Sequence, residues 1–175
     1  MSHCGIASQR SGTDAIDSIK AQYPFKDKRK LVMVAGGTGI TPMYQALQML
    51  IPRQGPEDRV ESIALLYGNK APEDILLKDE LDELAARSDG RLTVTHVVGT
   101  AADQAPIPGW DGALGWVDEA KFKAVAPPPA DDVLVMVCGL PALYESFCGP
   151  RTEAHVAEGS ILARLGYGEE MVAKF

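Results

Sequence analysis

The feature that most constrains the fold is an apolar run at residues 31–35 that leads directly into a glycine-rich segment. The run, Leu-Val-Met-Val-Ala, follows a cluster of charged residues, and it is typical of a strand buried on both faces. Residues 36–42 read Gly-Gly-Thr-Gly-Ile-Thr-Pro, and we expect a helix to begin there with Thr41 as its N-cap and Pro42 at its first position. Strand, glycine turn and helix start in this order predict one unit of a parallel sheet.

Similar apolar runs recur along the chain and alternate with amphipathic stretches. The runs lie at residues 62–67, 92–98 and 133–138, and the stretches at residues 43–50, 75–87 and 142–148. In the second stretch, Leu77, Leu81 and Leu84 recur at helical spacing, and Asp89-Gly90 follows as a helix end. Beyond loops at residues 106–115 and 127–129, we expect a short helix at 159–165 and an extended segment at 171–175. The alternation predicts an α/β fold, a doubly wound open parallel sheet of about five strands with helices on both faces.

Composition limits the number of domains and the kinds of partner. The 175 residues suit one domain, which we expect over residues 30–175 after an irregular polar lead-in at residues 1–29. The net charge of −7 argues against a nucleic-acid surface. The longest apolar run, residues 133–140, is far shorter than the ~20 residues of a membrane-spanning helix.

The start of the chain and its cysteines bear on cellular context. No secretory signal is visible at the start of the sequence. The three cysteines predict neither a disulfide framework nor, with the three histidines, a metal site. We therefore expect a cytoplasmic setting, or one facing the cytosol on a membrane through a segment absent here.

The glycine segment is the first candidate site. Gly36, Gly37 and Gly39 let the backbone approach a ligand closely, and the free N–H groups at a helix start favour an anion such as a pyrophosphate. The spacing Gly37-x-Gly39-x-x-Pro42 lacks the third glycine of the dinucleotide fingerprint. A tight strand-to-helix corner without a ligand is the alternative interpretation.

The segment Cys138-Gly139-Leu140-Pro141 ends another buried strand and is the second candidate. In a doubly wound sheet, ligands lie outside the carboxyl ends of the strands where strand order reverses, between the first and fourth strands. We therefore expect residues 36–41 to face residues 138–141. The Cys138 thiol is small and polarizable, which suits contact with a nicotinamide ring. A buried cysteine that merely ends a strand is the alternative.

The third candidate follows the second strand, where the ribose end of a dinucleotide commonly lies. Tyr67, Asn69, Lys70 and Asp74 offer hydrogen-bond donors and an acceptor there. A solvated helix start explains Asp74 equally well through the helix dipole. Lys70 is either a partner for a 2′-phosphate or, as we favour, a solvent-exposed side chain.

Four motifs in this order resemble the ferredoxin-reductase-like flavoprotein reductases, in the branch of cytochrome b5 reductase and nitrate reductase. The resemblance covers residues 29–175, and the motifs lie at residues 35–43, 66–69 with 74–77, 138–141 and 165–175. It implies a Rossmann-like pyridine-nucleotide domain that binds NADH, with NADPH not excluded, beside a separate antiparallel barrel that holds FAD. It also implies that Gly37, Thr38 and Gly39 line the cofactor crevice, that Thr38 and Cys138 are the catalytic pair at the nicotinamide, and that Phe175 belongs to the site.

The sequence also departs from the family pattern. The flavin-binding motif, Arg-x-Tyr followed by Ser or Thr, does not occur, so we expect the FAD-binding barrel outside this chain. Residue 140 is Leu where the family usually has Pro, and residue 173 is Ala where an aromatic is usual. Residues 97–100, Val-Val-Gly-Thr, lack the acidic residue common in NADH-preferring reductases, which leaves the coenzyme open.

The function expected from these features is that of a nucleotide-binding half of an oxidoreductase. It positions nicotinamide for hydride transfer to FAD, from which electrons pass to a one-electron acceptor such as cytochrome b5. The alternative is an isolated nucleotide-binding module without turnover of its own. A self-contained dehydrogenase is disfavoured, since the chain has no Tyr-x-x-x-Lys motif. The basic run at residues 26–30 either docks an acidic haem protein or is a solvated loop.

Overall fold

A computed structural model of the chain describes residues 27–52, 60–99 and 107–175. The described residues form one six-stranded sheet in the order β4-β3-β2-β1-β5-β6, and every neighbouring pair of strands is parallel. The strands are β1 (Lys30–Gly36), β2 (Ser62–Asn69), β3 (Leu92–Val98), β4 (Ala113–Leu114), β5 (Val133–Cys138) and β6 (Val172–Lys174). Most of the expected lead-in, residues 1–26, lies outside the described residues.

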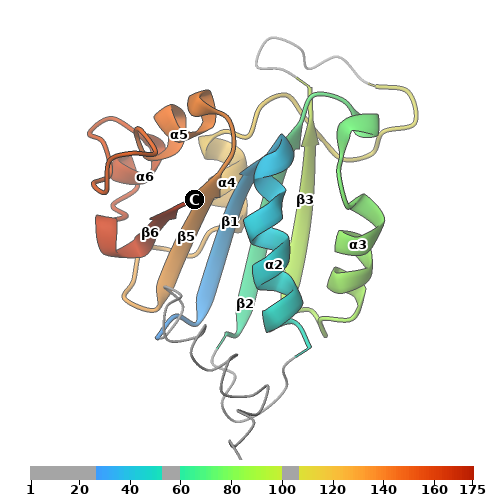
Figure 1. The fold of residues 1–175 in the computed structure, drawn as a ribbon, viewed down its shortest axis with the longest axis horizontal. Coiled ribbons are helices and arrows are strands. Elements are labelled where there is room, and N and C mark those ends of the chain that lie inside the picture. The colour runs from blue at the N-terminus through green and yellow to red at the C-terminus, as the bar shows by residue number, and fades with distance from the viewer. Residues whose placement is uncertain (1–26, 53–59, 100–106) are drawn as a thin grey trace, which may run out of the picture.

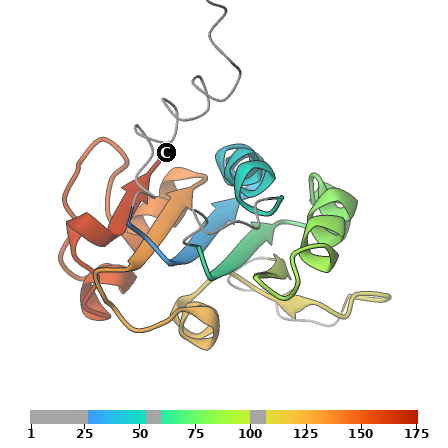
Figure 2. The same cartoon turned by 90° about the horizontal axis from the view of Figure 1, so that it is seen from below.

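Helices cover both faces of this sheet, as Figures 1 and 2 show. The α-helices are α2 (Ile40–Leu50), α3 (Lys78–Ala86), α4 (Glu119–Val125), α5 (Pro141–Phe147) and α6 (Ile161–Arg164), with 3-10 turns η1 (Gly37–Gly39), η2 (Pro72–Asp74) and η3 (Glu169–Met171). Helices α2 and α3 pack on one face, while α4, α5 and α6 pack on the other. The predicted doubly wound α/β fold is confirmed.

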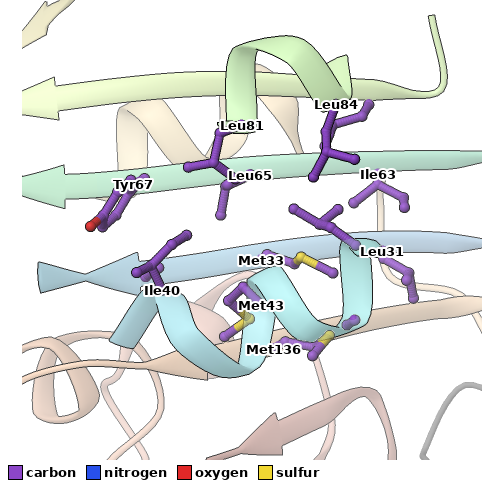
Figure 3. Close-up of a cluster of buried hydrophobic side chains, with 14 of the residues drawn as sticks. Leu31, Met33, Ile40, Met43, Ile63, Leu65, Tyr67, Leu81, Leu84 and Met136 are labelled. Carbon is purple, nitrogen blue, oxygen red and sulfur yellow. The ribbon is translucent and has the colours of Figure 1, made fainter. Parts of the chain in front are cut away.

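The central strand β1 shows why both faces need a helical layer. Leu31, Met33 and Ala35 point into the core beneath α2 and α3, whereas Val32 and Val34 point into the opposite core. Figure 3 shows the first core, in which Met33 and Met43 lie between β1 and α2. An apolar run with no polar position therefore reflects a strand that is buried from both sides.

Strand order reverses at β1. The chain leaves β1 through α2 and α3 to β2 and β3 on one side, then crosses the other face through α4 to reach β5 on the opposite side of β1. Ala35 is paired with both Tyr67 of β2 and Cys138 of β5. The segments that follow β1 and β5 consequently lie side by side at the same edge of the sheet. We call this edge, where the parallel strands end, the carboxyl edge.

Two expected helix starts were wrong. The turn η1 continues directly into α2, so Gly39 takes the N-cap position and Thr41 lies inside the first turn. The Thr41 hydroxyl donates to the Thr38 carbonyl at 3.0 Å rather than capping the helix. Pro42 is tolerated as the third residue of α2 because the first N–H groups of a helix have no internal acceptor.

The helix expected over residues 75–87 begins instead at Lys78. Leu77 adopts a left-handed conformation, with φ of +58°, that ends the connection from β2 and starts the helix. Ile75 is buried and Leu77 packs against the core, so this connection places apolar side chains inward before the helix begins. Periodicity alone does not distinguish such a connection from a helical turn.

Two elements were missed by the sequence reasoning. Helix α4 buries only Phe122 fully, so it carries little periodic signal, and β4 has two residues inside the expected loop at 106–115. Phe122 nevertheless packs edge-on against Phe147 and Tyr167, at centroid distances of 5.7 Å and 5.6 Å. No helix within the described ranges has both the length and the apolar composition to cross a bilayer.

Candidate functional site

The glycine and cysteine segments meet at the carboxyl edge, between β1 and β5. A methyl group added at Gly39 would lie 2.2 Å from the Cys138 carbonyl oxygen, and one at Gly139 would lie 3.1 Å from the Gly36 nitrogen. The two backbones are therefore in direct contact, and the Leu143 side chain lies against both Gly36 and Gly139. The structure brings together the segments that the sequence reasoning had placed on either side of a crevice.

The glycine turn also requires an unusual backbone. Gly37 has φ of +53°, a conformation that residues with a side chain rarely adopt, and a methyl group added on its open side would have no other atom within 4 Å. Thr38, next along the turn, is exposed. The segment thus presents free backbone and one hydroxyl side chain at the crevice.

The start of α2 has no competing negative group. Its N-cap makes no side-chain hydrogen bond, and its first turn contains no acidic residue. In the described part of the chain, α5 likewise has neither a side-chain cap nor an acidic first turn, whereas α3 and α4 have acidic first turns and α6 is capped by Ser160. Helix α2 is thus left with uncapped N–H groups and a positive dipole end, which suit an anion.

Tyr67 supports the glycine turn from below. It is fully buried, and its hydroxyl donates to the Gly37 carbonyl at 3.0 Å. Figure 3 shows its ring at the end of β2, beside Ile40 at the start of α2. Burial raises the pKa of Tyr67, so the phenol stays protonated and remains a donor. Tyr67 therefore contributes to the candidate site by holding the glycine turn in place.

The end of β2 carries a buried amide without a partner. Asn69 is 9% exposed, and its Nδ2 atom makes no well-aligned hydrogen bond within the described residues, although it lies near the Tyr67 hydroxyl. Lys70 and Asp74 are both exposed, the latter in η2. Gly99 donates its N–H to the Asn69 carbonyl at 3.1 Å, which ties the ends of β2 and β3 together. An unsatisfied buried donor here is consistent with a missing ligand.

Cys138, Phe175 and Tyr144 form the opposite wall. Cys138 is half-buried and is a free thiol, and the Phe175 N–H donates to the Val137 carbonyl at 3.1 Å. The Tyr144 hydroxyl donates to the main-chain oxygen of Phe175. The sequence reasoning missed Tyr144, because a tyrosine six residues after the cysteine carries no motif. Cys148, by contrast, is fully buried, and burial raises its pKa to about 11.

Two exposed apolar side chains flank the site. Leu140 is 67% exposed after β5, and Leu76 is 47% exposed after η2. They are the large hydrophobic side chains that stand out as exposed within the described residues, and both lie in segments that follow strands at the carboxyl edge. Pro141 begins α5 directly after Leu140. Apolar exposure beside a crevice is typical of a surface that another body covers.

The basic run lies away from this site, at the amino end of β1. Lys28 donates to the Asp131 carbonyl at 2.9 Å, Arg29 pairs with Glu61, and Lys30 lies 3.1 Å from Asp132. Lys26 is outside the described residues. The described basic side chains therefore serve contacts within the fold, which favours the loop interpretation over docking.

Comparison with known proteins supplies the family. Residues 33–149 match the family described as the oxidoreductase NAD-binding domain. The chain belongs to this oxidoreductase NAD-binding domain family. The matched range includes the glycine turn, α2, the end of β2 and the Cys138 segment, which are the parts of the candidate site.

Curated relatives carry the same domain within longer proteins. The chain is 36% identical over 161 residues to NADH-cytochrome b5 reductase 2 of Meyerozyma guilliermondii, covering 90% of this chain and 51% of that protein. It is 41% identical over 125 residues to a nitrate reductase [NADH] of Hordeum vulgare, covering 71% of this chain and 13% of that protein. The chain spans about half the length of the cytochrome b5 reductase relatives that it matches.

A solved structure agrees with this assignment. The cytochrome b5 reductase domain of Ulva prolifera nitrate reductase aligns with a TM-score of 0.67 and 26% identity, covering 85% of this chain and 50% of that one. The Rossmann-like fold and the resemblance to the cytochrome b5 reductase and nitrate reductase branch are thus confirmed. The roles of individual site residues stay predictions.

Proposed function

We propose that the chain is the NADH-binding half of a flavoprotein oxidoreductase and holds nicotinamide in position for hydride transfer. The observation that carries the proposal is the direct backbone contact between the Gly39 turn and the Cys138 segment at the point where strand order reverses. In doubly wound sheets this point is where dinucleotides bind. The family assignment supports the same interpretation.

The pyrophosphate would lie at the start of α2. The N–H groups of the Gly36–Gly39 turn and of Thr41 lie at a helix start that has no carboxylate in its first turn and no side-chain cap. Gly37 allows close approach because no side chain covers its open side. Tyr67 keeps the turn in place through its bond to the Gly37 carbonyl.

The adenosine end would lie beyond β2. The unpartnered Asn69 amide is a donor for a ribose or adenine acceptor, and Asp74 is an acceptor for a ribose hydroxyl. Lys70 is exposed, so it is open both to solvent and to a 2′-phosphate, and the choice of a solvated lysine stays a prediction. NADH remains the proposed coenzyme, with NADPH as the competing ligand in the test below.

The nicotinamide would lie between Thr38 and Cys138. Their task is to orient the ring and exclude water, because hydride transfer needs no acid or base from the protein. FAD, when bound on its own domain, supplies the acceptor of the hydride. The exposed Leu140 beside Cys138 fits a surface that the FAD-binding domain covers. A cytochrome b5-like haem protein is the proposed one-electron acceptor, in line with the named relatives.

Two measurements test this proposal. The purified chain should bind NADH saturably in a fluorescence titration and bind NADPH more weakly. In the chain reconstituted with the FAD-binding domain of a reductase, Thr38→Val and Cys138→Ser should each slow hydride transfer by about ten-fold or more, on the scale of lost positioning. Unchanged rates in both variants would refute the assigned roles.

The isolated nucleotide-binding module without turnover of its own remains the second candidate. A chain that is colourless, binds NADH and does not reduce ferricyanide even with the flavin domain present supports the module. A chain whose reconstituted complex oxidises NADH with ferricyanide supports the oxidoreductase.

A further inference from the structure

One buried hydroxyl joins two strand ends at the nicotinamide side of the crevice. Tyr144 lies in α5 and is 3% exposed, and its hydroxyl donates to the main-chain oxygen of Phe175. The Phe175 N–H in turn donates to the Val137 carbonyl at 3.1 Å. Phe175 is therefore fixed through both of its main-chain polar groups, one by β5 and one by α5.

Phe175 lies directly beside Cys138. The last paired residues of β5 and β6 are Val137 and Lys174, so Cys138 and Phe175 occupy the next position on each strand. Both side chains are partly buried and pack against the core beneath α2. Figure 1 marks the C-terminal end of the chain beside β5.

The Tyr144 hydroxyl also reaches Cys138 itself. The Cys138 side chain and the Gly139 backbone are among the groups that act on this hydroxyl. Burial, together with the hydrogen bond to Cys138, raises the pKa of Tyr144 to about 12. The phenol thus keeps its proton under ordinary conditions, and its single O–H donates to the Phe175 oxygen while the Cys138 side chain lies beside it.

We propose that Tyr144 is a positioning residue that fixes the Cys138 thiol and Phe175 relative to each other at the nicotinamide end of the crevice. Its effect on the coenzyme rests on the proposed function, whereas the contacts to Cys138 and Phe175 do not. Small displacements at a reacting centre lower reaction rates steeply. Fixing Cys138 and Phe175 therefore affects the rate of hydride transfer as well as the stability of the fold.

Removal of the hydroxyl alone separates these roles. In Tyr144→Phe the ring still fills its place in the core, while Phe175 loses one of its two tethers and the Cys138 side chain becomes free to rotate. NADH affinity should change by less than about two-fold, because the pyrophosphate and adenosine contacts lie at other elements. The geometry around Cys138 should change more.

Tyr167→Phe is a matched control. Tyr167 is also buried on the α4 and α6 face, and its hydroxyl donates to a main-chain oxygen, that of Pro127. Burial alone raises the pKa of Tyr167, with no contribution from Cys138. Both variants therefore lose one buried bond to the backbone, but only one of them alters the crevice.

The experiment measures alkylation of Cys138 in the whole chain by mass spectrometry, in a Cys4→Ser background, with and without saturating NADH. Cys148 serves as an internal reference, because its buried thiol with a raised pKa reacts slowly. In Tyr144→Phe, Cys138 should be alkylated about five-fold faster than in wild type, a ratio that corresponds to the free energy of one hydrogen bond. In Tyr167→Phe it should be alkylated at the wild-type rate. NADH should protect Cys138 strongly in wild type and in Tyr167→Phe, and several-fold less in Tyr144→Phe at equal saturation.

The outcomes separate the two levels of the account. Equal labelling and equal protection in the two tyrosine variants would overturn the positioning role. Faster labelling of Cys138 in Tyr144→Phe with unchanged protection by NADH would support the contact between Tyr144 and Cys138 but overturn its proposed effect on the bound coenzyme. Failure of wild type to bind NADH in the titration would overturn the proposed function, and the labelling rates would still decide whether Tyr144 fixes the thiol.

Discussion

The contact between Gly39 and Cys138 makes Gly39→Ala the most informative substitution. The added methyl carbon would lie 2.2 Å from the Cys138 carbonyl oxygen and 2.5 Å from its carbon. Ordinary contacts begin near 3.4 Å, so the two segments must separate by about 1 Å. Because both partners are backbone in buried strands or turns, no side-chain rotation relieves the clash.

The expected cost lies at the upper end of overpacking effects. We expect the free energy of unfolding to fall by about 3 kcal/mol, and Tm to fall by about 6–12 °C for a domain of this size. Separation of the segments should also weaken NADH binding by at least about ten-fold, since it alters the pyrophosphate turn and the nicotinamide wall together. Urea unfolding and an NADH titration at low temperature, where the variant is still folded, measure the two effects.

Two other glycines measure backbone strain alone, and Gly90, which lies outside the proposed site, is the control for NADH binding. Gly37 and Gly90 both have positive φ, +53° and +80°, and a methyl group at either would have nothing within 4 Å. Each change to Ala should cost about 1 kcal/mol through backbone strain. Gly90→Ala, in the turn between α3 and β3, should leave NADH affinity unchanged. A Gly39→Ala protein with wild-type stability and affinity would refute the argument from backbone contact.

Three further predictions follow from single contacts. Tyr67→Phe removes the donor to the Gly37 carbonyl and should lower the free energy of unfolding by about 1 kcal/mol, measured by urea unfolding, with weaker NADH binding; unchanged NADH affinity would contradict a role in holding the turn. Burial opposes ionisation of Asp118, but hydrogen bonds from the Lys121 side chain and N–H outweigh it and lower the Asp118 pKa below 3.8. The ionised Asp118 therefore stabilises the fold above that pH, and this stabilisation is lost as pH falls through the lowered pKa. Asp118→Ala should lower the free energy of unfolding by about 1 kcal/mol at pH 7 and by progressively less in acid. A difference between variant and wild type that persists at pH 2 would contradict the role of the ionised carboxylate. Lys70→Ala should change the ratio of NADPH to NADH affinity by less than about two-fold, as expected for an exposed lysine, and a large loss of NADPH binding alone would show a 2′-phosphate contact.

The sequence contained most of the information about the sheet. Strands β1 and β5 are apolar and buried over nearly their whole lengths, and their runs predict them within a residue. The reversal of strand order, and with it the meeting of the Gly39 and Cys138 segments, followed from connection rules for parallel sheets. The part of the site that consists of backbone was therefore accessible from sequence.

The errors have local physical causes. Thr41 was expected as the N-cap because its hydroxyl and the following proline suit that place, but the 3-10 turn moves the start of α2 toward the glycines. Helix α4 was not predicted because Phe122 is its only fully buried residue, so the segment has no apolar periodicity. The role of Tyr144 depends on a contact with a residue 31 positions later, which no local pattern records.

The central claim is that the turn after β1 and the segment after β5 together hold a dinucleotide. An NADH titration of the ¹⁵N-labelled chain, followed by the chemical shift of each backbone amide, tests it most directly. We expect saturable shifts that are largest at Gly37, Thr38, Gly39 and Gly139, with smaller ones at Asn69. The absence of saturable shifts, or shifts concentrated at the amino end of β1 around Arg29 and Lys30, would contradict it.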